Sequence, residues 1–295
     1  MIHPADTTPE VLRYAAFTDA GRGGNPAGVV LDAGGLDDAA RVEVAARVGY
    51  SETAFVEAGE EKDHFRVRYF SPRAEVAFCG HATIATAVAI AQRQGAGTLH
   101  LSTLAGPITV DTEITADGVT ATLTSVPTRT RPTRADELDG ALVALRWAHD
   151  DLDPRYPAHV AHAGNDHLVL AVRERARLAA LDYDYAALAA LMERHGWTTA
   201  HLVWAESPTL FHARDPFPPG GVVEDPATGA AAAAFGGYLR DLGLVGVPSR
   251  VTVLQGADMG RPSRLVVDVL AGDERVKVTG TAAPIPPDAS SPEQG

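Results

Sequence analysis

Two acids and a proline, Glu224-Asp225-Pro226, stand just before an alanine-rich segment of the chain. Thr228-Gly229 follows, and residues 230–239 are then small or apolar. Aspartate is a favoured N-cap, and proline suits the first position of a helix, so the pattern predicts a helix from Pro226 capped by Asp225. A helix that is apolar all round is expected to be buried.

The start of a buried helix can bind an anion. Its first N–H groups have no partner within the helix, and the helix dipole adds partial positive charge there. The Asp225 motif is therefore either the cap of a core helix or one wall of a site for a small carboxylate. Gly80-His81-Ala82-Thr83 leads into a second apolar segment, residues 82–92. Two such helices in similar domains could face one cleft.

Composition and charge exclude several classes of protein. The net charge of −13 argues against nucleic acid and anionic membranes as partners. The first ten residues have no apolar segment typical of a signal peptide, and no apolar run reaches the roughly 18 residues of a membrane span. We therefore expect a cytoplasmic protein.

Residue counts narrow the chemistry. Cys79 is the only cysteine, which excludes internal disulfides, a zinc site made of cysteines and a racemase with two opposed thiols in one chain. Lys62 in a charged turn and Lys277 in a strand pattern make pyridoxal phosphate chemistry unexpected. At the spacing of a strand, His159 and His162 would face opposite sides, so we do not expect them to bind one metal ion. The glycines form no nucleotide-binding motif.

The two halves of the chain repeat one order of elements at low direct identity. Period-two patterns predict strands, and capping signals and longer apolar periods predict helices. In the first half the predicted helices cover residues 38–48 and 82–92, and the strands cover residues 11–17, 28–31, 51–56, 64–70, 99–103, 108–114 and 119–126. In the second half the helices lie near residues 135–147, 185–195 and 226–239, and the strands near residues 158–163, 167–172, 200–205, 250–254, 264–270 and 274–280. Residues 127–132 are interpreted as a linker.

Five sequence blocks occur in the order found in a known family. They are Phe17-Thr18 with Gly24-Asn25-Pro26-Ala27, Ser51 to Val56, Arg68 to Thr83, Glu224 to Gly229, and Gln255-Gly256 with Gly260-Arg261-Pro262-Ser263. Over about residues 11–282 the chain resembles the phenazine-biosynthesis PhzF-like proteins.

The resemblance implies an α+β fold of the diaminopimelate-epimerase-like class. Two similar domains would each wrap a curved, mostly antiparallel sheet round a central helix, with the active site between them. The N-terminal domain is expected over residues 1–127, with the last strand, about 274–283, able to cross back to it. The C-terminal domain is expected over residues 133–273, and a disordered tail over residues 284–295.

The resemblance also implies a cofactor-independent isomerase that moves a proton within a small cyclic carboxylate, as in trans-2,3-dihydro-3-hydroxyanthranilate isomerase. Glu52 would take the proton from one carbon and return it to another on the same face. This role needs a raised pKa, for which Ala54 and Phe55 offer an apolar wall. Family members need no metal and are commonly homodimers.

The resemblance gives His81 and Asp225 roles in substrate polarisation and proton handling. From the residues alone, His81 could be a helix-start histidine bonded to backbone, and Asp225 an N-cap. The substrate carboxylate is expected to bind the residues at the two helix starts, together with a further polar residue: Gly80, Ala82, Thr83, Thr228, Gly229, Ala230 and Asn25.

One position departs from the family pattern. Ala230 stands where the phenazine-pathway isomerase has a serine, so a hydroxyl that would bind the substrate is missing and the natural substrate is expected to differ.

Cys79 is interpreted as a small buried hydrophobe, and Glu75 and Glu224 as partners of arginines. Two alternatives stay open: an epimerase or racemase that pairs Glu52 with Asp225 or Cys79, and a non-catalytic binder of small molecules.

Overall fold

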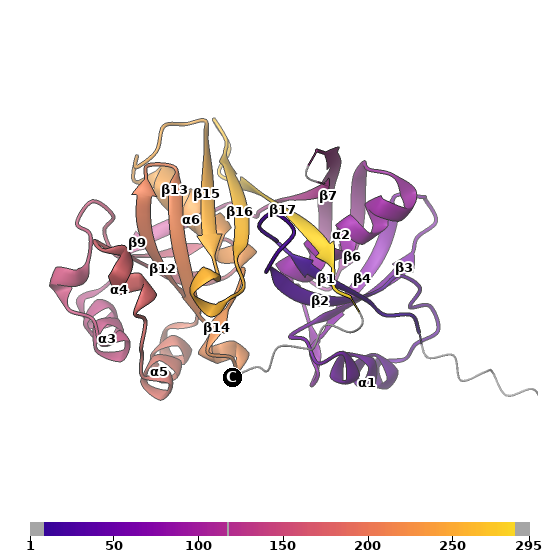
Figure 1. Cartoon of the computed structure of the whole chain (residues 1–295), viewed down its shortest axis with the longest axis horizontal. Coiled ribbons are helices and arrows are strands. Elements are labelled where there is room, and N and C mark those ends of the chain that lie inside the picture. Colours follow the sequence, from indigo (N-terminus) through magenta and orange to yellow (C-terminus); the bar gives the residue numbers. More distant parts are fainter. Residues whose placement is uncertain (1–8, 117, 287–295) are drawn as a thin grey trace, which may run out of the picture. The chain divides into compact units, whose positions relative to one another are not determined.

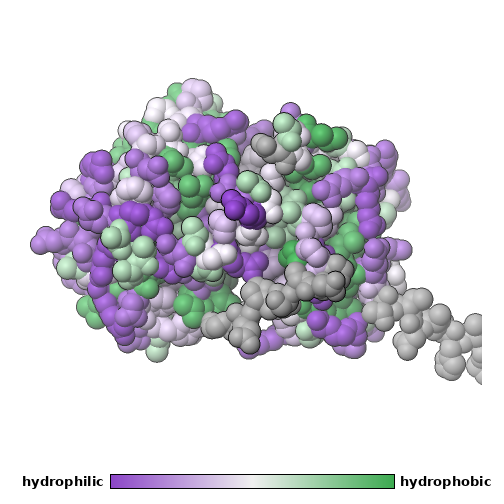
Figure 2. Space-filling view, viewed as in Figure 1, coloured by the Kyte–Doolittle hydropathy of each residue, from purple (hydrophilic) through white to green (hydrophobic). Residues whose placement is uncertain are grey.

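Two compact units make up the chain, whose computed structural model describes residues 9–116 and 118–286 (Figure 1). Unit 1 contains the chain up to Ala16, then Pro26–Ala121, and again the chain from Thr281. Unit 2 contains Phe17–Asn25 and Thr122–Gly280. No helix among the described residues is both long and apolar enough to span a membrane. On the face in Figure 2, hydrophilic side chains cover much of the surface, and hydrophobic ones form smaller patches.

In unit 1, a sheet of short strands surrounds one buried helix, α2 (Gly80–Gln94). Every residue of α2 from His81 to Ala91 is buried. Strands β3 and β4, β4 and β5, and β6 and β7 pair antiparallel, whereas β2 with β3 and β4 with β6 are parallel. The other elements are β1 (Leu12–Ala16), β2 (Asn25–Val30), α1 (Asp38–Val48), β3 (Thr53–Ala58), β4 (His64–Phe70), β5 (Glu75–Val76), β6 (Thr98–Thr103), β7 (Gly106–Thr115) and β8 (Gly118–Thr124), which continues into unit 2 from Thr122.

Unit 2 repeats this plan around α6 (Gly229–Asp241), which is buried from Ala231 to Leu239 and packs on β9, β10, β11 and β16. Its elements are β9 (Arg129–Pro132), α3 (Ala135–Leu145), β10 (His159–His162), β11 (Asp166–Val172), α4 (Arg175–Ala179), α5 (Tyr185–His195), β12 (Trp197–Ser207), β13 (Leu210–Pro216), β14 (Glu224–Asp225), β15 (Ser249–Gln255), β16 (Ser263–Val269) and β17 (Val276–Pro284). Three short 3₁₀ helices cover His149–Asp151, Pro218–Gly220 and Ala257–Met259.

The two units repeat the same order of elements around the central helix. In unit 1, β3, β4 and β5 lead to α2 and then to β6 and β7. In unit 2, β12, β13 and β14 lead to α6 and then to β15 and β16. Each set has the same pairing directions, with the strand after the central helix parallel to the strand two before that helix. The predicted α+β class with two similar halves is therefore confirmed.

Residues 17–25 group with unit 2, although the sequence analysis assigned them to the N-terminal domain. The Arg264 N–H donates to the Phe17 carbonyl (2.8 Å), and the Gly24 N–H donates to the Pro262 carbonyl (3.0 Å). Conversely, the end of β17 belongs to unit 1: after Gly280 this strand pairs antiparallel with β1. Of the tail expected to be disordered, Pro284 ends β17, and residues 287–295 lie outside the described residues.

The interpretation of residues 127–132 as a linker was wrong. Arg129–Pro132 is strand β9, paired antiparallel with β10. Thr128 is buried, and its hydroxyl donates to the Glu274 carbonyl (2.7 Å) and accepts from Arg240 Nη2 (3.0 Å). Thr128, Thr130 and Arg131 form hydrogen bonds with the rest of unit 2, whereas Arg129 is exposed to water.

We expect Gly237→Ala to destabilise the protein by about 1–3 kcal/mol, the usual cost of overpacking. Alanine is the better helix former by about 1 kcal/mol, but its Cβ would lie only 2.5 Å from Thr128 Cβ, and two hydrogen bonds hold Thr128 in place. Denaturant unfolding measures the change. Gly246→Ala, with nothing within 4 Å of the new Cβ, is the control. Equal stability of the two variants would contradict the assigned packing.

Candidate active site

The start of α2 carries the first group of candidate residues. Cys79 is the N-cap residue, with extended backbone and no capping hydrogen bond from its side chain. The Thr83 N–H and hydroxyl both donate to the Cys79 carbonyl (3.0 and 2.7 Å), and the Thr83 hydroxyl lies 2.6 Å from that of Tyr69. These contacts fix the backbone of Cys79. They also use the Thr83 N–H, and the role of Thr83 in binding a substrate carboxylate stays a prediction.

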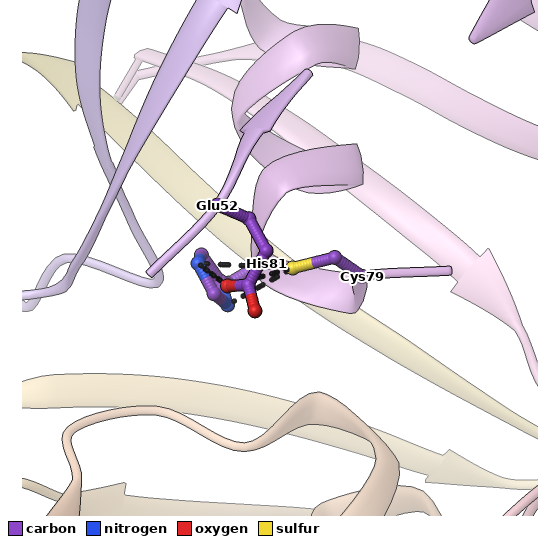
Figure 3. A group of neighbouring side chains, drawn as sticks. All are labelled: Glu52, Cys79 and His81. Atoms are coloured by element: carbon purple, nitrogen blue, oxygen red, sulfur yellow. Dashed lines mark hydrogen bonds and ion pairs between the residues drawn. The ribbon is translucent and has the colours of Figure 1, made fainter. Parts of the chain in front are cut away.

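Glu52, Cys79 and His81 form a tight cluster, which we call the Glu52 cluster (Figure 3). Glu52 Oε2 lies 3.5 Å from Cys79 Sγ and 3.4 Å from His81 Nε2, and the sulfur lies 3.4 Å from His81 Nδ1. The Glu52 side chain is 19% exposed and that of His81 is 9% exposed. Cys79 is therefore more than the small hydrophobe that the sequence indicated, because its sulfur contacts two polar groups.

The backbone places Glu52 just ahead of β3, where the Gly28 N–H donates to the Glu52 carbonyl (3.2 Å). The side chain thus begins at a fixed point of the sheet, next to a helix start whose dipole favours negative charge. A partly buried carboxylate beside a thiol and an imidazole can accept a proton and return it. This arrangement is suited to general acid–base chemistry.

Asp225 is not the N-cap of a helix that starts at Pro226, as the sequence analysis expected. Helix α6 begins at Gly229, with Thr228 as its N-cap residue. Asp225 belongs to β14, where it pairs with Asp215 of β13. Pro226 also disfavours a helical backbone conformation at the residue before it, so Asp225 stays extended.

The Asp225 carboxylate nevertheless belongs to a polar group at the start of α6, which we call the Asp225 cluster. Oδ1 accepts from Asn25 Nδ2 (2.7 Å), and Oδ2 accepts from the Thr228 hydroxyl (2.6 Å). Asn25 also donates to the Ala227 carbonyl (3.2 Å). The predicted residues Asn25, Asp225 and Thr228 are thus brought together, with Gly229 and Ala230 in the first turn of α6.

Gln255 holds this loop, a role that the sequence analysis did not give it. Its Oε1 accepts from the Thr228 N–H (3.1 Å), and its Nε2 donates to the Asp225 carbonyl (2.7 Å) and the Thr228 hydroxyl (3.1 Å). Gln255 is fully buried. Its place in the Gln255-Gly256 block was the available signal. The Thr228 N–H thus donates to Gln255 and its hydroxyl to Asp225, and its role in binding a substrate carboxylate stays a prediction.

An arginine holds the two-residue strand before each central helix. Arg68 Nε and Nη2 donate to Glu75 (both 2.7 Å), and Arg214 Nε donates to Glu224 Oε1 (3.0 Å). The hydrogen bond from Arg68 lowers the pKa of Glu75, whereas burial raises the pKa of Glu224 above its usual value despite Arg214. The predicted ion pairing of both glutamates is confirmed.

The backbone positions left to bind a carboxylate are those of the first helical turns. They are Gly80 and Ala82 in unit 1, and Gly229 and Ala230 in unit 2. N–H groups in a first turn have no carbonyl four residues earlier in the helix, so they can donate to an anion. The structure gathers the predicted residues into two groups, one in each unit, and their action on one substrate stays a prediction.

Comparison with known proteins supports one family. The model of the family "Phenazine biosynthesis-like protein" matches residues 14–286. The chain is 32% identical to isomerase YddE of Escherichia coli K12, covering 93% of this chain and 95% of that protein. It is 31% identical to trans-2,3-dihydro-3-hydroxyanthranilate isomerase of Pseudomonas chlororaphis, covering 84% of this chain and 86% of that protein.

Solved structures show the same fold. The phenazine biosynthesis protein of the PhzF family from Bacillus anthracis matches with a TM-score of 0.83 at 25% identity, covering 94% of this chain and 96% of that one. The fold is thus of the diaminopimelate-epimerase-like class that the motifs indicated. The chain belongs to the PhzF family of phenazine biosynthesis-like proteins, and it is an isomerase.

Proposed function

We propose that this isomerase moves a proton between two carbons of a small cyclic carboxylate, with Glu52 as both acid and base. The observation that carries the proposal is the Glu52 cluster, in which a mostly buried carboxylate lies within 3.5 Å of a thiol and an imidazole at a helix start. The chemical class of the substrate is taken from the name of the Pseudomonas chlororaphis relative.

In the proposed reaction, Glu52 removes a C–H proton and the substrate gains negative charge. The first-turn N–H groups of α2, at Gly80 and Ala82, stabilise the substrate carboxylate through which that charge spreads. Glu52 then returns the proton to a second carbon on the same face. His81, 3.4 Å from Glu52 Oε2, orients the carboxylate and holds a proton during the transfer. The substrate is rearranged without net gain or loss of atoms or electrons.

The Asp225 cluster acts on the same substrate in this proposal. Asn25 and Thr228 fix the two oxygens of Asp225, so the carboxylate is oriented before a substrate arrives. It would polarise a ring substituent, while Gly229 and Ala230 offer N–H groups to a second anionic atom. The proposal includes a cytoplasmic homodimer that serves a pathway of phenazine type. Light scattering of the purified protein tests the dimer.

A second candidate reaction is epimerisation by two unlike bases, either Glu52 with Asp225 or Glu52 with Cys79, and the geometry excludes the second pair. Two opposed bases must flank the reacting carbon at about 3–3.5 Å each, so they lie about 6–7 Å apart. Cys79 Sγ and Glu52 Oε2 are 3.5 Å apart, which leaves no room for a carbon between them. Glu52 with Asp225 remains. Reaction in deuterium oxide with analysis of product stereochemistry separates the candidates, because a second base delivers a solvent deuteron to an inverted carbon, whereas the shuttle moves the substrate's own proton to another carbon without inversion.

We expect Glu52→Gln to lower kcat by about 100- to 10,000-fold, the usual contribution of a general acid–base group, while the fold is kept. Glutamine preserves the shape of the side chain but cannot carry the proton. The assay uses trans-2,3-dihydro-3-hydroxyanthranilate and a panel of cyclic carboxylates, followed by proton NMR. Glu60→Gln, an exposed position, is the control. Full turnover by Glu52→Gln would refute the role of Glu52.

We expect Ala230→Ser to raise kcat/KM for trans-2,3-dihydro-3-hydroxyanthranilate by roughly 2- to 10-fold, because one hydrogen bond contributes about 0.5–1.5 kcal/mol. Ala230 is half-buried in the first turn of α6, where a hydroxyl could reach a bound substrate. Ala230→Val adds bulk without a hydroxyl and is the matched control. An equal gain with valine, or no gain with serine, would contradict the specificity role of this position.

A further inference from the structure

We propose that Glu52, Cys79 and His81 bind a zinc ion, and that the bound ion switches off proton transfer by Glu52. The binding site is inferred from the geometry and chemistry of three side chains. The inhibition rests in addition on the proposed catalytic role of Glu52.

The distances between the three donor atoms fit a tetrahedral zinc ion. Zinc binds sulfur at about 2.3 Å, histidine nitrogen at about 2.0–2.1 Å and carboxylate oxygen at about 2.0–2.2 Å, so donors on one tetrahedron lie about 3.4–3.6 Å apart. In the Glu52 cluster, oxygen to nitrogen is 3.4 Å, oxygen to sulfur is 3.5 Å, and sulfur to His81 Nε2 is 3.8 Å. The sulfur also lies 3.4 Å from His81 Nδ1, beside the ring, so the imidazole would have to turn about its Cβ–Cγ bond to aim Nε2 at an ion held by the other two donors.

The donor types favour zinc over the common hard cations. Magnesium and calcium prefer sets made only of oxygen, whereas sulfur with imidazole and carboxylate is a zinc set. A thiolate and a carboxylate together balance the charge of Zn²⁺. Three protein ligands leave a fourth position for water or substrate, as in reactive zinc sites. The position of Cys79 is also fixed, because the Thr83 N–H and hydroxyl both donate to its carbonyl.

The sequence analysis excluded a zinc site made of cysteines, since Cys79 is the only one. A mixed set was not visible, because Glu52 precedes Cys79 by 27 residues and only the fold brings them together. Among the described residues a second cluster, Glu61, Asp63 and His64, also gathers potential ligands. Its side chains are 76%, 51% and 45% exposed and contain no sulfur, so it serves as a matched control.

Coordination of zinc by Glu52 Oε2 would remove the oxygen that accepts the substrate proton. The metal would therefore act as a reversible inhibitor and not as a cofactor of the isomerase. Cellular zinc, or a chelator that removes it, would set the fraction of active enzyme.

The test uses full-length protein freed of metal with a chelator and titrated with Zn²⁺ alone by calorimetry, and with Co²⁺ by absorption. We expect one Zn²⁺ per chain that requires the Glu52 cluster, and a thiolate-to-cobalt band in the near ultraviolet. Cys79→Ser should abolish the band and weaken zinc binding by about 100-fold or more, whereas His64→Gln should leave both unchanged. Circular dichroism confirms that each variant is folded.

The binding and the inhibition have separate outcomes. A wild-type protein without the cobalt band, or with zinc affinity unchanged by Cys79→Ser, overturns the site. If zinc binds through the Glu52 cluster but leaves isomerisation at its full rate, the switch is overturned. The proposed function fails independently, when metal-free Glu52→Gln turns over substrate as fast as the wild type.

Discussion

A buried helix start must find partners for N–H groups that the helix itself cannot satisfy, and the rest of this structure depends on that constraint. Helices α2 and α6 are buried over most of their length, and neither N-cap residue supplies a capping hydrogen bond from its side chain. Each helix start therefore keeps its donors and partial positive charge available. The negative groups beside them are Glu52 in unit 1 and Asp225 in unit 2.

Because the two units repeat one plan, the residues at the starts of α2 and α6 can be compared position by position. An arginine–glutamate pair holds the strand before each helix, and a glycine opens each helix, at Gly80 and Gly229. The residues around these glycines differ in chemistry. Unit 1 has Cys79 and His81, which can carry protons, where unit 2 has Thr228 and Ala230, which cannot near neutral pH. The side chains at the start of α2 thus include groups that can exchange protons, whereas those at the start of α6 do not.

Local signals were sufficient for part of the fold. Helix α1 has the predicted bounds, because Asp37 caps the Ala40 N–H and Gly49 closes the helix in the left-handed conformation. Tertiary contacts decided the rest. The Asp225-Pro226 pair has the composition of a helix start, but pairing with β13 and the Gln255 side chain hold it extended. Cys79 contacts His81 nearby in the sequence, but its other polar contact is Glu52, which is distant in sequence and contributes no local pattern. Family motifs indicated both positions, but not these contacts.

Strand β17 has a consequence for how the protein is made. Its segment after Gly280 pairs with β1, so Ala282 and Ala283 lie against Ala16 and Ala15 from the beginning of the chain. Unit 1 is therefore closed by residues that the ribosome delivers after nearly all of unit 2. During synthesis, the edge of β1 that pairs with β17 stays unpaired until this last strand has been made. The sheet of unit 1 therefore cannot be completed before unit 2 has been synthesised.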